Sequence, residues 1–193
     1  MLNVGYLTSN TTASGDEMYT PFYAVTPLVK YLKYSGYKTI WCPFDEEWSA
    51  YVQMFREEGF NVIRSSLSDG KDFFQHEPNE PYDVIVSNPP FSKKDKVLRR
   101  LDELGKPFAI LLPLNSLQGK SRFEIFKKGI QVLVFDQRIG FHTPKSMTAP
   151  VEGSPFASAY FCRGVLLGRD LIIEKLDKFH RPLIKEGLCK DDG

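Results

Sequence analysis

The sequence has few cysteines, no excess of either charge and no long apolar run. Its three cysteines are widely spaced and include no Cys-x-x-Cys pair, which argues against a disulfide framework and a structural zinc site. A net charge of +1 gives no general attraction to nucleic acid, so any such binding needs a local basic patch. No apolar stretch approaches the ~20 residues that span a bilayer, and the N-terminus lacks a signal-peptide pattern. We therefore expect a protein of the reducing cytoplasm.

The length of 193 residues suits one well-buried domain, residues 1–193. Strand-like and helical patterns alternate along it, which predicts βαβ units and an α/β fold, with a mostly parallel sheet covered by helices on both faces. We expect helices over 21–32, 48–58, 93–104 and 122–128, and strands over 39–42, 61–64, 82–87, 108–112 and 132–135. Further expectations are an N-terminal arm over 1–20, a candidate substrate loop over 138–155, a strand pair over 157–162 and 165–167, and a closing helix over 170–179.

One corner of the sequence combines rigidity with polar chemistry. Asn88-Pro89-Pro90-Phe91 follows the apolar run VIVS, so a parallel sheet would deliver it to the edge where ligands bind. The prolines fix φ and remove two backbone donors, which leaves a corner that presents acceptors. The Asn88 side-chain carbonyl adds an acceptor, and Phe91 offers a flat apolar face. This arrangement predicts a pocket for an exocyclic amine on an aromatic base; the alternative is a plain turn with Phe91 in the core.

In this position the tetrapeptide resembles the catalytic motif of amino-group methyltransferases that use S-adenosylmethionine. Two further segments resemble the adenine-N6 members of that family: DEMYTP at residues 16–21, and GKDFF at residues 70–74. The similarity covers about residues 16–112. It implies a Rossmann-like class I methyltransferase fold with a mostly parallel, seven-stranded sheet, in which the catalytic residues are Asn88, Pro89, Pro90 and Phe91.

The cofactor loop departs from the usual pattern of that family. The usual Asp-Pro-Phe-x-Gly-x-Gly has glycines that let the backbone approach the ligand, whereas this chain has CPFDEEWS at residues 42–49. That loop resembles a glycine-poor subgroup of bacterial and phage DNA adenine methyltransferases, in which Asp45 would supply a carboxylate contact. The usual acidic residue after the second strand is replaced by Ser65-Ser66. The resemblance implies that S-adenosylmethionine is bound by Tyr19, Thr20, Pro21, Pro43, Phe44, Asp45, Asp72 and Phe73.

Basic residues near the corner are candidates for contact with nucleic acid. Lys93 and Lys94 open a helix rich in lysine and arginine, where phosphate contact would make binding salt-dependent; a solvated helix face is the alternative. In the candidate substrate loop, Arg138 and Lys145 are basic and Phe141 is able to stack or wedge. We expect this loop to read the substrate sequence; an ordered surface loop is the alternative.

The resemblance implies methyl transfer from S-adenosylmethionine to the exocyclic N6 amine of adenine in DNA, by base flipping and direct in-line displacement. It also implies a phage or restriction-modification role. Adenine in RNA, or another amine, is an alternative substrate. A second alternative is a catalytically inactive methyltransferase fold that binds nucleic acid, while the missing G-x-G-x-x-G argues against a dinucleotide-binding enzyme. No motif indicates a metal site, and scattered surface or loop positions are expected for the histidines, His76, His142 and His180.

Overall fold

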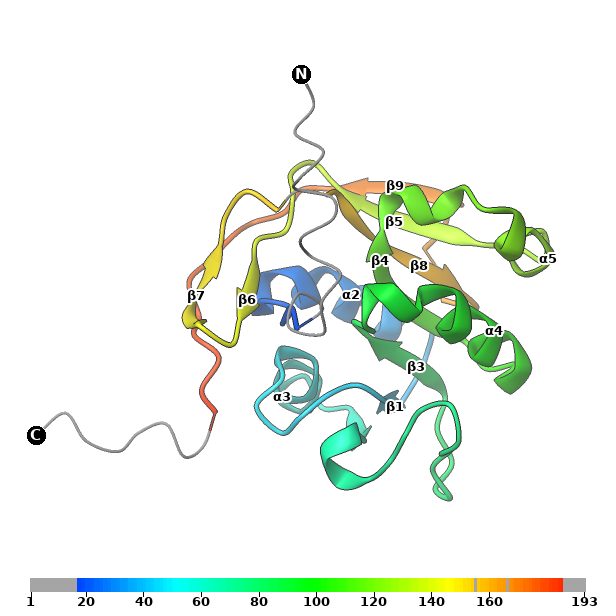
Figure 1. Cartoon of the computed structure of the whole chain (residues 1–193), viewed down its shortest axis with the longest axis horizontal. Coiled ribbons are helices and arrows are strands. Elements are labelled where there is room, and N and C mark those ends of the chain that lie inside the picture. The colour runs from blue at the N-terminus through cyan, green and yellow to red at the C-terminus, as the bar shows by residue number, and fades with distance from the viewer. Residues whose placement is uncertain (1–16, 155, 166, 186–193) are drawn as a thin grey trace, which may run out of the picture.

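The computed structural model describes residues 17–154, 156–165 and 167–185. Its main feature is a seven-stranded sheet in the order β2-β1-β3-β4-β8-β5-β9, beside a separate hairpin of β6 and β7 (Figure 1). Most of the expected N-terminal arm, and Asp16 of the DEMYTP segment, lie outside the described residues. The strands of the large sheet are β1 (Thr39–Cys42), β2 (Asn61–Arg64), β3 (Val84–Ser87), β4 (Phe108–Pro113), β5 (Gln131–Phe135), β8 (Ser158–Arg163) and β9 (Leu171–Glu174).

The α-helices connect these strands largely where the sequence predicted them. They are α2 (Phe22–Tyr34), α3 (Ala50–Glu57), α4 (Lys94–Leu104) and α5 (Phe123–Phe126). Up to residue 135 the helix and strand ends agree with the predicted ranges within about two residues, the spread that assignment methods show among themselves. Gly36 and Gly59 follow α2 and α3 with φ of 76° and 87°, a left-handed conformation that glycine adopts at helix ends. Within the described ranges, no helix is both long and apolar enough to cross a membrane.

The sheet is parallel except for one strand. β2, β1, β3 and β4 pair in parallel, whereas β8 is antiparallel to both of its neighbours, β4 and β5, and β9 again runs parallel to β5. β3 and β4 are buried along their whole length, as continuous apolar runs in a parallel sheet require. The predicted α/β class with a mostly parallel, seven-stranded sheet is therefore confirmed.

Helices cover both faces of the sheet, and β8 shows which helices lie on which face. The Tyr160 hydroxyl donates to the carbonyl of Ala24 in α2 and lies 2.9 Å from the Tyr51 hydroxyl in α3. The next residue, Phe161, stacks with Phe126 of α5 at a centroid distance of 5.8 Å. Because neighbouring residues of a strand point to opposite faces, α2 and α3 lie on one face and α5 on the other.

Two expectations near the C-terminus are wrong. The segment expected as a helix over 170–179 contains β9, whose β-branched residues pair in parallel with β5 at the sheet edge. The strand expected over 165–167 is absent at its described residues, because Val165 and Leu167 lie outside every strand and the Leu167 amide donates to the Val165 carbonyl at 2.9 Å. Local periodicity cannot separate these outcomes, since they depend on which strand edge is free to pair.

The candidate substrate loop is a β-hairpin rather than an irregular loop. β6 (Phe141–Thr143) and β7 (Ser146–Val151) are antiparallel and joined by a two-residue turn. The hairpin also pairs with the N-terminal segment, because Tyr19 and His142 exchange two backbone hydrogen bonds of 2.9 Å. Residues 17–19 are thereby held against a hairpin that lies much further along the chain.

Candidate functional site

The candidate site lies at the carboxyl edge of the sheet, beside β1 and β3. The chain passes from β1 outward to β2 and returns to β3 on the other side of β1, which makes this edge a topological switch point, where α/β proteins bind ligands. A cavity of about 590 Å³ opens here, a size typical of sites for small molecules. Its lining comes from residues 17–20, part of residues 44–51, residues 66–68, and Asn88, Pro90 and Lys185.

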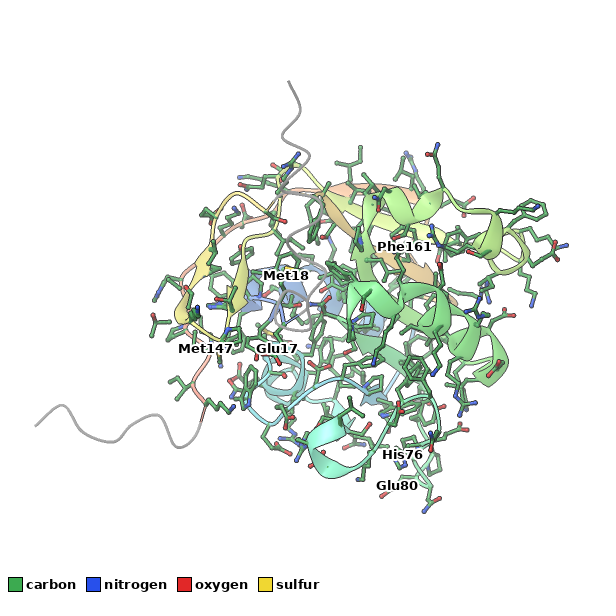
Figure 2. All side chains as sticks on the ribbon, viewed as in Figure 1. Glu17, Met18, His76, Glu80, Met147 and Phe161 are labelled. Atoms are coloured by element: carbon green, nitrogen blue, oxygen red, sulfur yellow. The ribbon has the colours of Figure 1, made fainter. Side chains whose placement is uncertain are left out.

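The Asn88 side chain is held in one orientation by the N-terminal segment. Its Nδ2 donates to the Met18 carbonyl at 2.8 Å, and because a carbonyl only accepts, this contact fixes which end of the amide faces Met18. The other end, Oδ1, is buried and has no hydrogen-bond partner in the described part of the chain. Buried acceptors are normally paired, so Asn88 presents an acceptor that lacks a donor. Figure 2 shows Glu17 and Met18 beside the hairpin that carries Met147.

The rest of the Asn-Pro-Pro-Phe corner turns the chain from β3 into α4. Pro90 lines the cavity, and its carbonyl accepts the Lys93 amide at 3.0 Å, which starts a 3-10 turn over Phe91–Lys93. Pro89 is buried and is not part of the cavity lining. The Phe91 ring is only 9% exposed and packs edge-on against Phe141 and Phe156, with centroid distances of 6.3 and 5.4 Å.

Asp45 places a buried carboxyl in the cavity wall. It is 6% exposed, and burial raises its pKa to about 7, against the opposing effect of hydrogen bonds from Ser87 and Ser49. The Ser87 hydroxyl donates to Asp45 Oδ2 at 2.5 Å. Because Ser87 immediately precedes Asn88, this bond joins the loop after β1 to the Asn-Pro-Pro-Phe corner. A carboxyl with a strongly shifted pKa in a cleft is typical of functional sites.

Aromatic side chains form the apolar part of the wall. Phe44 lines the cavity and is supported from behind by Phe73, at a centroid distance of 4.9 Å. Phe73 is 2% exposed and does not reach the cavity. Asp72 also lies away from the lining, where its Oδ1 accepts the Phe74 amide at 3.0 Å in a local turn. The structure therefore places Asp72 and Phe73 behind the wall that they were expected to form.

The DEMYTP segment contributes its middle residues to the wall. Tyr19 packs edge-on against Trp48 at 4.7 Å, and partial burial together with Glu17 raises the pKa of Tyr19 to about 12. Thr20 is buried and also lines the cavity. Pro21 occupies the N-cap position of α2 and lies behind the lining, as does the buried Pro43.

Three backbone amides of the glycine-poor loop already have partners in the folded protein. The Asp45 amide donates to the Ser65 carbonyl at 3.3 Å, the Glu46 amide to Ser49 Oγ at 2.9 Å, and the Ser49 amide back to the Glu46 carbonyl at 3.0 Å. In a glycine-rich loop, the backbone approaches the ligand closely. Here recognition of a ligand by residues 45, 46 and 49 depends on side chains.

Charges in the cavity are mostly negative. Glu17, Asp45 and Glu46 are carboxylic acids of the lining, and Lys185 is its one basic residue within the described chain. Ser68 Oγ donates to Glu46 Oε1 at 2.7 Å. The sequence did not predict Glu46 or Lys185 as site residues. Glu46 follows Asp45, which the motif did assign, whereas no local signal marks Lys185.

The basic residues proposed for nucleic acid lie on the surface. Lys93 is exposed, and the partly exposed Lys94 has its Nζ 3.5 Å from the Phe91 carbonyl. Arg138 is exposed and donates to the Ser154 carbonyl at 2.9 Å, and Lys145 is exposed at the hairpin turn. These positions leave the charged groups accessible to a large partner.

Two hairpin residues occupy positions that differ from their expected roles. Phe141 is 3% exposed and packs on Phe91, so its ring supports the corner from inside and is not presented as a wedge. His142 is fully buried, in contrast to the expected surface or loop position, and its Nδ1 lies 3.1 Å from the Ser146 carbonyl. Burial lowers the pKa of His142, because it penalises the charged form.

Comparisons with known proteins give little beyond the fold. No protein-family model matches the sequence, and no curated protein matches it either. Among solved structures, one described as "a putative methyltransferase from Thermoplasma acidophilum" is similar at 9% identity and a TM-score of 0.31, covering 72% of this chain and 71% of that one. A TM-score this low supports no conclusion about the function of this chain.

The strand order itself defines the class to which this fold is similar. A mixed seven-stranded α/β sheet with its antiparallel strand, β8, between β4 and β5 resembles the sheet of class I methyltransferases. The chain is thus a protein with a methyltransferase-like Rossmann fold, and its cavity lies at the edge where that fold binds ligands.

Proposed function

We propose that this protein transfers a methyl group from S-adenosylmethionine to the exocyclic N6 amine of adenine in DNA. The observation that carries the proposal is the Asn88 amide at the switch point, whose Nδ2 is bound by Met18 and whose Oδ1 lacks a donor. An exocyclic amine supplies such a donor. Asn88 Oδ1 would accept one amino proton and, with the rigid Pro89-Pro90 backbone, orient the nitrogen lone pair for attack.

The cavity residues fit the proposed cofactor. When bound, S-adenosylmethionine supplies an electrophilic methyl group on a sulfonium centre. The Glu17 and Glu46 side chains suit positively charged groups of a ligand, and Phe44 and Trp48 provide aromatic surface for its base. The same acidic lining disfavours ligands rich in phosphate, such as dinucleotides.

DNA is proposed as the substrate polymer from the resemblance of the motifs and from the surface charges. Lys93 and Lys94 lie directly after the corner, Arg138 precedes the β6–β7 hairpin, and Lys145 lies in the turn of that hairpin. Contacts from such residues to phosphates would position the duplex without reading its sequence. The base would enter the site after flipping out of its stack.

The test is transfer of labelled methyl from S-adenosylmethionine to unmethylated DNA and RNA, with nucleosides identified by mass spectrometry. We expect N6-methyladenine in DNA, and a loss of roughly a hundred- to a thousandfold in Asn88→Ala, as for removal of a preorganised hydrogen-bonding group. Asn79→Ala, at an exposed asparagine before β3, is the matched control and should retain activity.

Other outcomes separate the alternatives. Methyl label found only in RNA would support the proposed reaction with RNA, instead of DNA, as the substrate. Transfer that survives in Asn88→Ala would remove the corner from catalysis. No transfer to either polymer, with no binding of S-adenosylhomocysteine by calorimetry, would contradict the enzyme and favour an inactive fold that binds nucleic acid.

A further inference from the structure

The described C-terminal residues form a strap, residues 175–185, that crosses the molecule after β9. Figure 1 shows it running from β9 alongside the β6–β7 hairpin toward the C-terminus. At its start, the Leu176 amide donates to Asp136 Oδ1 at 2.9 Å, and Gln137 Nε2 donates to the Leu176 carbonyl at 2.6 Å. Lys178 then pairs with Glu152, beyond the end of β7, at 2.8 Å.

The second half of the strap is fixed to the helices and the hairpin. Arg181 makes two hydrogen bonds of 2.6 and 2.8 Å to Glu57 of α3, and its guanidinium lies 3.7 Å from the centroid of the Phe22 ring in α2. The buried Leu183 donates its amide to the Met147 carbonyl at 3.0 Å. These contacts determine where Ile184 and Lys185 lie.

The strap ends at the cavity with Lys185. This residue is part of the cavity lining, and its Nζ is 5.9 Å from the centroid of the Trp48 ring, which also lines the cavity. All other ionisable acids and bases of the lining are carboxylic acids or tyrosines. Among the residues that the structure describes, the lining therefore carries several acidic groups and a single basic group.

A zwitterionic amino-acid group requires this combination of charges. Its ammonium suits carboxylates, whereas its carboxylate needs a cation or backbone amides. The amides of residues 46 and 49 donate to partners within the loop, and the Asp45 amide donates to the Ser65 carbonyl after β2, so these amides are not available to a ligand carboxylate. A cation from elsewhere in the chain would fill this role.

We infer that Lys185 binds the amino-acid carboxylate of the ligand in this cavity, and that the C-terminal strap thereby supplies what the glycine-poor loop does not. The inference rests on the proposed function, since it assigns a residue to the methionine part of that cofactor. It predicts that ligand recognition depends on Lys185, which lies far along the chain from the DEMYTP segment.

The test compares two ligands that differ in the amino-acid part. S-adenosylhomocysteine carries the amino and carboxylate groups, whereas 5′-methylthioadenosine has the same adenosine and sulfur without them. We expect Lys185→Met, which keeps the length of the side chain but not its charge, to weaken S-adenosylhomocysteine binding about five- to tenfold in calorimetry. Binding of 5′-methylthioadenosine should not change.

Two variants act as controls. Lys185→Arg keeps the charge and should retain most of the preference for S-adenosylhomocysteine. Lys175→Met removes an exposed lysine of the same strap, paired with Asp177 at 3.2 Å and absent from the cavity lining, and should bind both ligands as the wild type does.

The possible failures are distinguishable. If Lys185→Met binds both ligands like the wild type, or loses affinity for both equally, the carboxylate contact is wrong while the proposed cofactor stands. If the wild type binds neither ligand, the proposed function fails and the inference fails with it.

Discussion

Asp45→Asn tests whether the cavity holds a carboxyl at a cost to stability. Folding raises the pKa of Asp45 from 3.8 to about 7, mainly by burial. Each pKa unit corresponds to ~1.4 kcal/mol, so the folded state disfavours the ionised carboxylate by roughly 4 kcal/mol. Asparagine has nearly the same shape, and its carbonyl can still accept the hydrogen bond from Ser87.

The sign follows from proton binding. Between about pH 4 and pH 7 the folded protein holds a proton on Asp45 that the unfolded chain has released. Wild-type stability therefore falls as the pH rises through this window and levels off above it. The Asp45→Asn variant lacks this contribution, so it should gain stability relative to the wild type as the pH increases.

Urea unfolding followed by tryptophan fluorescence at several pH values between 4.5 and 8 measures this difference. We expect the free energy of unfolding of the variant to exceed that of the wild type by roughly 2 to 4 kcal/mol at pH 8, with a smaller difference at pH 4.5. The same variant should bind S-adenosylhomocysteine more weakly, because a carboxylate is lost from the cavity. Parallel pH profiles of the two proteins would refute the reasoning.

Two further predictions concern charged residues near the site. Arg56 and Arg64 lower the pKa of Glu47 to about 2, so the contribution of Glu47 to stability is present above pH 4.5 and is lost as the pH falls toward 2. Thermal unfolding should show that Glu47→Gln is less stable than the wild type at pH 7 and that the difference in stability disappears in acid. A difference that stays constant with pH would contradict this prediction. Arg181→Ala removes the paired hydrogen bonds to Glu57 that hold the strap; it should weaken S-adenosylhomocysteine more than 5′-methylthioadenosine in calorimetry, and equal losses would count against a positioning role.

Most of the sheet could be predicted because its strands are continuous apolar runs between glycine-terminated helices. Val84–Ser87 and Phe108–Pro113 are buried on both faces, so composition alone indicates strands there. Leu171–Glu174 could not be assigned in this way, because it is an edge strand with half of its residues exposed. Its identity depends on pairing with β5, which is far away in sequence.

The candidate site likewise contains residues that the sequence could predict and residues that it could not. Asn88 and Asp45 were predicted from motifs at the ends of strands, and the structure places both at one cavity. Lys185 belongs to no motif, and its place is determined by contacts with α3, α2 and the hairpin. The orientation of the Asn88 amide was equally inaccessible, because it depends on the Met18 carbonyl from another part of the chain.

Because of the contact between Asn88 and Met18, the site is complete only when distant parts of the chain have folded together. Met18 is held beside the corner by the backbone pairing of Tyr19 with His142, so the amide is fixed only when residues near 18, 88 and 142 have all assembled. A nascent or partly unfolded chain would leave that amide free to rotate. Under the proposed function, methyl transfer would begin only after the last of these segments had docked, so incomplete chains would be inactive rather than poorly selective.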